Sequence, residues 1–159
     1  MIAAILAAGL LALDIAGVDT TYEILAPGID DGPTVKASDS VKMHALGMVE
    51  EGQKKFWSTQ DPGMRPFEYT AGVGKVIKGW DQGCLGMKLG EKRRLRIPAH
   101  EGYGNNGFPA WGIPGGATLL FEIECLEIAG TSLTNRKKKK IWVGEGNTGP
   151  NGEKVKEDL

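Results

Sequence analysis

The residues best suited to shape a binding site in this sequence are large apolar groups on one short segment, residues 75–87. Val76, Trp80, Cys84 and Met87 follow helical spacing there, so one face of a short helix is expected to carry the indole ring of Trp80 into the core. In that position Trp80 would form the floor of a pocket. Such a pocket offers shape and apolar surface rather than a reactive group.

The thiols and imidazoles show no reactive pattern. Cys84 and Cys125 are the two cysteines, and no metal-ligand spacing such as CxxC joins them. Free cysteines are often buried, so two buried apolar thiols are the first interpretation and a disulfide between them is the alternative. His44 and His100 have no acidic or thiol group at ligand or triad spacing. We therefore expect no metal site and no nucleophilic chemistry.

The composition is that of an ordinary globular protein. The chain has 159 residues, of which 41% are hydrophobic and 25% charged. This length is enough for one hydrophobic core but too short for two cores of stable size. The net charge of −1 gives no overall field that would attract nucleic acid, so no nucleic-acid partner is expected. The 24 glycines favour many turns over long helices.

Short alternating segments, bounded by turn residues, predict a sheet. The expected strands cover residues 21–25, 41–46, 56–59, 66–69, 92–97 and 117–128. Residues 60–65 interrupt one returning strand as a bulge or flap. Because consecutive strands surround a single helix, the fold class is α+β, with an antiparallel twisted β-sheet wrapped around one short α-helix.

The Gly- and Pro-rich stretch at residues 99–116 is long for a loop inside a compact domain. Loops of that length are usually functional. This one carries Tyr103, Phe108, Trp111 and Ile113, apolar groups that need a surface to pack against. We therefore expect this loop to be functional.

The two ends differ from the middle. Met1 to Leu13 contains no charge but is shorter than the roughly 20 residues that span a bilayer, and it lacks the positive flank of a secretory signal. It is interpreted as a leader or as a docking segment. Arg136 to Val143 places five positive charges before an apolar triplet, which suits a solvated tail, an anionic lipid surface or an acidic partner. The expected division is an N-terminal segment 1–19, a domain 20–130 and a tail 131–159.

Several motifs, in order, resemble the FKBP-type peptidyl-prolyl cis-trans isomerases, the immunophilins that also bind the macrolides tacrolimus and rapamycin. The resemblance covers about residues 21–128. It rests on the following segments: Met48-Val49-Glu50-Glu51-Gly52, Lys55-Phe56, Pro66-Phe67-Glu68-Tyr69, Val76-Ile77-Lys78-Gly79-Trp80, Gly102-Tyr103-Gly104 and Ala117-Thr118-Leu119-Leu120-Phe121-Glu122.

The resemblance implies a hydrophobic cleft that binds a proline ring above Trp80. Its implied lining is Phe56, Phe67, Val76, Ile77, Trp80, Tyr103, Ile113 and Phe121. The main-chain N–H of Ile77 and the hydroxyl of Tyr103 would hold carbonyl groups of the substrate or drug. Rotation about an Xaa-Pro bond breaks no covalent bond and faces a barrier of about 20 kcal/mol. No cofactor or metal is therefore required.

Two positions depart from the family pattern. Ala45 stands where most active members have a tyrosine, and Trp57 stands where an aspartate follows the pocket phenylalanine. Each change removes a polar pocket group, and Trp57 adds bulk beside the cleft. The loop at residues 108–113 is also one residue longer than usual. These departures make macrolide binding doubtful and leave the level of activity open.

Three functions follow from these observations. The first is a prolyl isomerase that assists the folding of proline-containing client proteins. The second is a weakly active or inactive binding module, and the third, compatible with the first, is a subunit of a larger, membrane-associated complex held by Met1 to Leu13 and Arg136 to Val143. For localisation, the apolar start favours an organelle lumen, such as the chloroplast thylakoid, or a secretory route over the cytoplasm.

Overall fold

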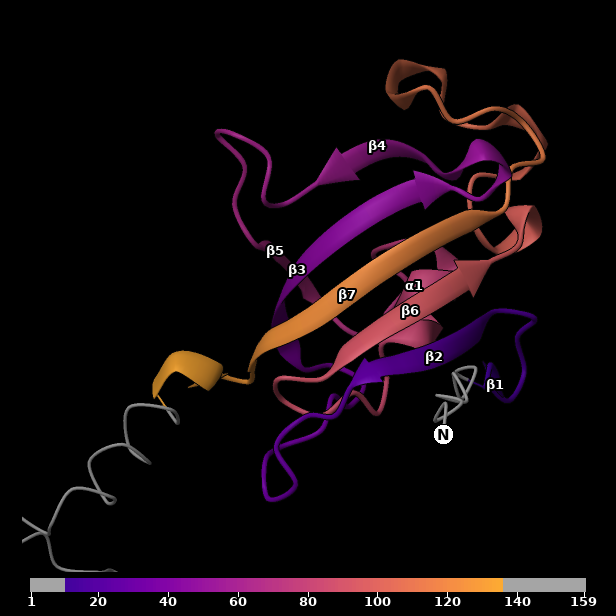
Figure 1. The fold of residues 1–159 in the computed structure, drawn as a ribbon. Coiled ribbons are helices and arrows are strands. Elements are labelled where there is room, and N and C mark those ends of the chain that lie inside the picture. Colours follow the sequence, from indigo (N-terminus) through magenta and orange to yellow (C-terminus); the bar gives the residue numbers. More distant parts are fainter. Residues whose placement is uncertain (1–10, 136–159) are drawn as a thin grey trace, which may run out of the picture.

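The computed structural model describes residues 11–135, and these form one antiparallel sheet that curves around a short helix (Figure 1). The main strand order is β1-β2-β6-β7-β3-β4, while β5 pairs with β3 and β8 pairs with β7. This confirms the α+β class with an antiparallel sheet. The strands are β1 (Leu13–Asp14), β2 (Thr21–Ala26), β3 (Ser40–Val49), β4 (Lys54–Ser58), β5 (Phe67–Thr70), β6 (Lys92–Ile97), β7 (Leu119–Ile128) and β8 (Thr131–Ser132).

The central pair, β3 and β7, shows why this sequence forms a sheet. Buried and partly exposed residues alternate along both strands, so one face packs on the core and the other meets solvent. On β7, Leu119, Phe121, Ile123 and Cys125 are buried, as the alternation predicts. Ala45 of β3 lies opposite Ile123. A slip of one residue would turn every one of these side chains to the wrong face.

The helix α1 (Lys78–Gly83) lies on the concave side of the sheet against β6. It is shorter than the helical spacing of residues 75–87 indicates. Ile77 is extended at the N-terminal boundary, with φ −53° and ψ 145°, and Gly86 takes a positive φ of 79° after the helix. Trp80, Cys84 and Met87 are nevertheless all buried, because the turn that follows the helix keeps the same side inward.

Two glycines let the helix approach the sheet closely. A Cβ at Gly79 would lie 2.5 Å from atoms of Ile97 and Thr20, and a Cβ at Gly83 would lie 2.7 Å from Leu95. Any side chain at either position would push the helix away from β6. The glycines therefore fix the depth at which Trp80 sits.

The strands β4 and β5 both pair with β3, at different parts of its length. This matches the expected returning strand with an interruption. The register of β3 and β4 shifts between Gly47 and Met48, so that Phe56 and Trp57 are both partly buried and both pack against the core.

The sheet extends beyond residues 20–130 at both ends. Leu13 pairs with Tyr22, and Thr131 pairs with Ile128, while Leu133 is buried in the core. The rest of the apolar start, residues 1–10, and the segment Arg136 to Val143 lie outside the described residues. Within residues 11–135, no helix is long and apolar enough to cross a membrane.

Candidate functional site

Trp80 lies at the base of a cleft of about 330 Å³ between α1 and the inner face of the sheet. Its indole meets Phe121 edge to face, with ring centroids 4.9 Å apart, and meets Phe67 in the same manner at 5.7 Å. Only 4% of Trp80 is exposed. The helix and two strands thus supply the floor. The lining of this aromatic cleft is Trp57, Phe67, Lys75, Val76, Ile77, Trp80, Tyr103, Trp111 and Phe121.

The structure brings six of the eight residues expected from the sequence into this lining, and the other two lie behind it. The ring centroid of Phe56 lies 5.7 Å from that of Phe121 and 6.3 Å from that of Trp111. Phe56 therefore supports the wall from outside. Ile113 is only 2% exposed and belongs to the core. Both residues shape the cleft through their neighbours.

Three residues of the lining were absent from the expected set: Lys75, Trp57 and Trp111. From sequence, Trp57 is a departure that adds bulk beside the cleft. Trp111 is an apolar side chain that needs a surface to pack against. The missing signal was spatial, because the two tryptophans are 54 positions apart in the sequence and meet only in the fold.

Two polar groups at the cleft are free to bind a ligand. Within residues 11–135, the hydroxyl of Tyr103 has no hydrogen-bond partner and the main-chain N–H of Ile77 donates to no acceptor. Partial burial raises the pKa of Tyr103 above its ordinary value, so its hydroxyl stays protonated at neutral pH. The cleft can therefore donate two hydrogen bonds from otherwise apolar walls.

The long loop that carries Tyr103 and Trp111 is tied together by its own backbone. The N–H of Phe108 donates to the carbonyl of Ile113 at 2.8 Å, and the N–H of Ile113 donates back at 3.1 Å. Gly107 must be a glycine, because its φ is 62° and an added Cβ would lie 2.3 Å from the Ile113 carbonyl oxygen. This closed loop places Trp111 at the edge of the cleft.

Ala45 is buried on β3 and lies beside the wall rather than in the cleft lining. Its carbonyl accepts a hydrogen bond from the N–H of Thr59, and its own N–H donates to the Thr59 hydroxyl, each at 3.0 Å.

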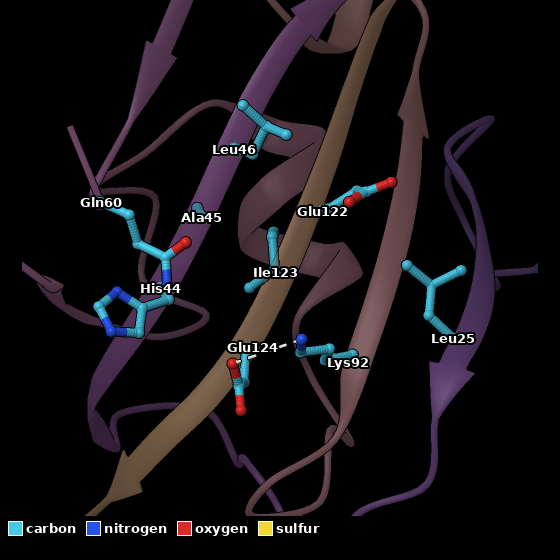
Figure 2. A pocket seen from close by; sticks show the side chains of 9 residues that line it. All are labelled: Leu25, His44, Ala45, Leu46, Gln60, Lys92, Glu122, Ile123 and Glu124. Atoms are coloured by element: carbon cyan, nitrogen blue, oxygen red, sulfur yellow. Dashed lines mark ion pairs between the residues drawn. The ribbon is translucent and has the colours of Figure 1, made fainter.

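A second, smaller depression lies on the opposite face of the sheet, away from α1 (Figure 2). Its walls mix the imidazole of His44 with the apolar Leu25 and Leu46, and Lys92 and Glu124 form an ion pair across two strands. These are side chains of the solvent-facing side. Nothing in the depression resembles a reactive arrangement.

The imidazole of His100 does have an acidic neighbour, contrary to the expectation from sequence spacing. Its Nε2 lies 2.9 Å from a carboxylate oxygen of Asp19, which is 81 positions away in the sequence. Glu101 is next to this pair and is buried, but its oxygens already accept hydrogen bonds from the N–H groups of Asp19 and Thr20 and from the Thr20 hydroxyl. The group fastens the N-terminal segment to the domain.

Both cysteines are free and buried, so the first interpretation of the thiols is confirmed and the disulfide is not formed. Burial raises the pKa of Cys84 and that of Cys125 to about 12. Protonated thiols are poor nucleophiles. They act here as small core residues.

Comparison with known proteins agrees with this geometry. The family model described as "FKBP-type peptidyl-prolyl cis-trans isomerase" matches residues 32–126. The chain is 44% identical over 108 residues to "Peptidyl-prolyl cis-trans isomerase FKBP12" of Arabidopsis thaliana, covering 67% of this chain and 95% of that protein. It is 50% identical over 97 residues to the Vicia faba protein of the same name, covering 60% and 87% respectively. It is 46% identical over 114 residues to "FK506-binding protein 2" of Emericella nidulans, covering 72% and 78%. The chain belongs to the FKBP-type peptidyl-prolyl cis-trans isomerases.

Proposed function

We propose that the aromatic cleft binds an Xaa-Pro segment of a client protein, with the proline ring above Trp80, and accelerates rotation of the peptide bond before it. The observation that carries this proposal is a buried indole beneath a cleft with two free donors, Tyr103 and the N–H of Ile77. No side chain needs to attack the substrate.

The chemistry follows from the amide itself. A planar amide has charge separation between its nitrogen and oxygen, and this separation falls as the bond twists. Transfer from water into an apolar cleft therefore costs the planar amide more than the twisted one. Donors that hold neighbouring carbonyls in the twisted geometry add binding that is stronger in the transition state than in the ground state.

The test is cis/trans exchange of Leu-Pro and Phe-Pro peptides, measured by NMR with the full chain. We expect exchange cross-peaks to strengthen with the wild-type protein and to weaken with Trp80→Leu, after circular dichroism has shown that the variant is folded. Peptide binding without faster exchange would overturn the proposal and indicate a docking module.

The same cleft is proposed to bind macrolides weakly. The side chain of Trp57 cannot accept a hydrogen bond from a polar ligand, as a carboxylate could. Its ring also packs against neighbours in the cleft, with centroid distances of 6.3 Å to Trp80 and 6.1 Å to Phe67. Titration with tacrolimus, followed by tryptophan fluorescence, tests this. Tight binding by the wild-type chain would contradict it.

A further inference from the structure

The loop before β7 contains an asparagine followed by a glycine, Asn106-Gly107, at the end of the short 3₁₀ helix Gly104–Asn106. In such a pair the main-chain nitrogen of the glycine can attack the side-chain amide of the asparagine, and the glycine has no Cβ to hinder the approach. Asn105 is exposed like Asn106, but the residue after it carries a side chain. The two asparagines therefore differ in the group that follows them and not in their access to water.

The fold leaves both reacting groups of this pair unengaged. Other N–H groups of the loop donate to its own carbonyls, namely those of Phe108, Trp111, Gly112, Ile113 and Gly116. Within residues 11–135, the N–H of Gly107 has no acceptor at hydrogen-bond distance and angle, and the side-chain amide of Asn106 has no hydrogen-bond partner. No hydrogen bond of either group has to break before the nitrogen of Gly107 approaches the amide carbon of Asn106.

The same fold requires the glycine at position 107. Its φ of 62° and ψ of −156° lie in a region that is essentially restricted to glycine. A Cβ here would also lie 2.3 Å from the carbonyl oxygen of Ile113. The loop therefore keeps beside Asn106 the one residue type that leaves its amide open to attack.

We propose that Asn106 is a site of spontaneous modification, at which the side-chain amide is converted to a mixture of aspartate and isoaspartate. The nitrogen of Gly107 loses its proton to hydroxide and forms a bond to Cγ of Asn106. The bond from Cγ to Nδ2 breaks, and Nδ2 takes up a proton and leaves as ammonia. The product is a cyclic imide.

Water then opens this imide at one of two bonds. Hydrolysis between Cγ and the ring nitrogen gives aspartate with the original main chain. Hydrolysis between the main-chain carbonyl carbon of residue 106 and the ring nitrogen gives isoaspartate. Both steps are substitutions at a carbonyl carbon, so no oxidant or reductant takes part.

The isoaspartate form lengthens the main chain of the loop. Its path runs through Cβ and Cγ of residue 106, which adds one atom, or about 1.5 Å. The loop is anchored on both sides of this residue: the Gly104 carbonyl accepts a hydrogen bond from the Gly116 N–H at 2.9 Å, and Phe108 pairs with Ile113 at 2.8 and 3.1 Å. Such bonds keep donor and acceptor about 2.7–3.2 Å apart. The added length should therefore loosen these anchors.

The experiment follows the full chain at pH 6 and pH 8 by peptide mapping and mass spectrometry. We expect Asn106 to gain the mass difference between an amide and an acid several-fold faster than Asn105. Its conversion should be faster at pH 8, since the attacking nitrogen must lose a proton. Peptide mapping separates Asn106 from Asn151, which also precedes a glycine but lies outside the described residues. Asn106→Gln is the matched control, because glutamine keeps the amide but has to close a larger ring, and it should stay unmodified.

A second measurement reports the effect on the loop. An Asn151→Gln chain is aged at pH 8, and the fraction modified at Asn106 is separated by ion exchange. Deuterium exchange of the Phe108, Ile113 and Gly116 amides is then compared by NMR with that of the unmodified chain. We expect these amides to exchange several-fold faster in molecules that contain isoaspartate. Asn106→Asp controls for the added charge and should keep the wild-type rates.

Two results would overturn the proposal. If Asn106 stays an amide in the native chain at pH 8, whether or not it converts in urea, the loop protects it and the modification site is refuted. If the amides of Phe108, Ile113 and Gly116 keep their exchange rates in the isoaspartate form, the anchors do not depend on the length of the main chain. Failure of the proposed function has a different signature, because an unmodified chain that does not accelerate Xaa-Pro exchange would still convert Asn106.

Discussion

Ala45 and Thr59 are joined by two hydrogen bonds at 3.0 Å, from the Thr59 N–H to the Ala45 carbonyl and from the Ala45 N–H to the Thr59 hydroxyl. These bonds fasten the end of β4 to β3. Trp57 precedes Thr59 by two residues and pairs with Gly47. Gly47 in turn follows Ala45 by two residues on β3. Ala45 and Trp57 are therefore diagonal neighbours on adjacent strands, close enough for their side chains to compete for space.

The first prediction is that positions 45 and 57 are energetically coupled. Ala45→Tyr should destabilise the fold by about 1–3 kcal/mol, because a ring is added to a filled region. Trp57→Asp should destabilise it by about 2–3 kcal/mol through lost ring contacts. The double variant should lose about 1 kcal/mol less free energy of unfolding than the two single variants lose together, because replacing the indole by aspartate leaves space for the tyrosine ring.

Urea unfolding of the four proteins measures this coupling. Ala45→Tyr combined with Ile24→Ala is the control, because Ile24 lies on β2 at a distance from the pair, and its effects should add. Simple additivity of the changes at positions 45 and 57 would show that Trp57 does not occupy the space left by Ala45.

A second prediction concerns the free hydroxyl of Tyr103. Tyr103→Phe removes this donor but keeps the ring that contacts Phe108. Peptide affinity or kcat/KM should fall roughly 2- to 10-fold, the effect of one hydrogen bond of about 0.5–1.5 kcal/mol. Stability should change little, since the hydroxyl has no partner within residues 11–135.

The measurement is the NMR exchange assay together with a urea unfolding curve. Phe108→Leu is a useful comparison, because it alters the neighbouring ring but leaves the hydroxyl. An unchanged kcat/KM in Tyr103→Phe would remove the hydroxyl from the mechanism.

The sheet was predictable because its physical signal is local. Alternation along β3 and β7 and the Arg-rich pattern of β6 each appear within ten residues of sequence, and burial of one face enforces that period. The floor of the cleft was predictable for the same reason, with the family resemblance adding the role of Trp80. The two-residue strands β1 and β8 were not predicted, because segments so short carry no period.

The parts of the site that were missed depend on contacts between distant residues. Trp57 and Trp111 each looked like an isolated apolar residue, and their stack exists only because a closed loop folds back over β4. Likewise, the sequence around His100 does not predict its contact with Asp19. Helix length was overestimated because apolar spacing continues through the turn around Gly86, where the backbone has already left helical geometry.

A third prediction follows from the buried thiols. Burial raises the pKa of both Cys84 and Cys125 to about 12 in the folded protein, while an unfolded thiol ionises near its ordinary pKa of 9.0. Above pH 9 the unfolded state therefore binds fewer protons than the folded state. The contribution of the two thiols to the free energy of unfolding should be fully present below pH 9 and should be lost between pH 9 and 12, by up to about 1.4 kcal/mol per pH unit for each thiol.

Urea unfolding at pH 8 and pH 10 tests the slope, and Cys125→Ala should reduce it. In the native protein at pH 8, iodoacetamide should modify neither cysteine, whereas both should react in urea. Rapid alkylation of the native chain would contradict the burial of these thiols.

The last prediction concerns Glu101, which fastens the N-terminal segment to the domain. Its carboxylate accepts hydrogen bonds at 2.8 Å from the N–H groups of Asp19 and Thr20, and another from the Thr20 hydroxyl. Burial opposes ionisation, but these bonds outweigh it, so the pKa of Glu101 lies below its ordinary value. The stabilisation is therefore present above the unfolded pKa, roughly 4.3, and is lost as pH falls through the folded value.

Glu101→Gln keeps the size of the side chain but turns an NH₂ group toward donors, so it should cost about 1–3 kcal/mol at pH 7. The difference between wild type and variant should shrink at pH 3, where the carboxyl of the wild type takes up a proton. Asp19→Asn is the matched control, since its exposed carboxylate contacts His100 at the surface, and it should cost less than about 1 kcal/mol. Equal losses in the two variants at pH 7, with no change at pH 3, would show that the buried carboxylate does not hold this segment.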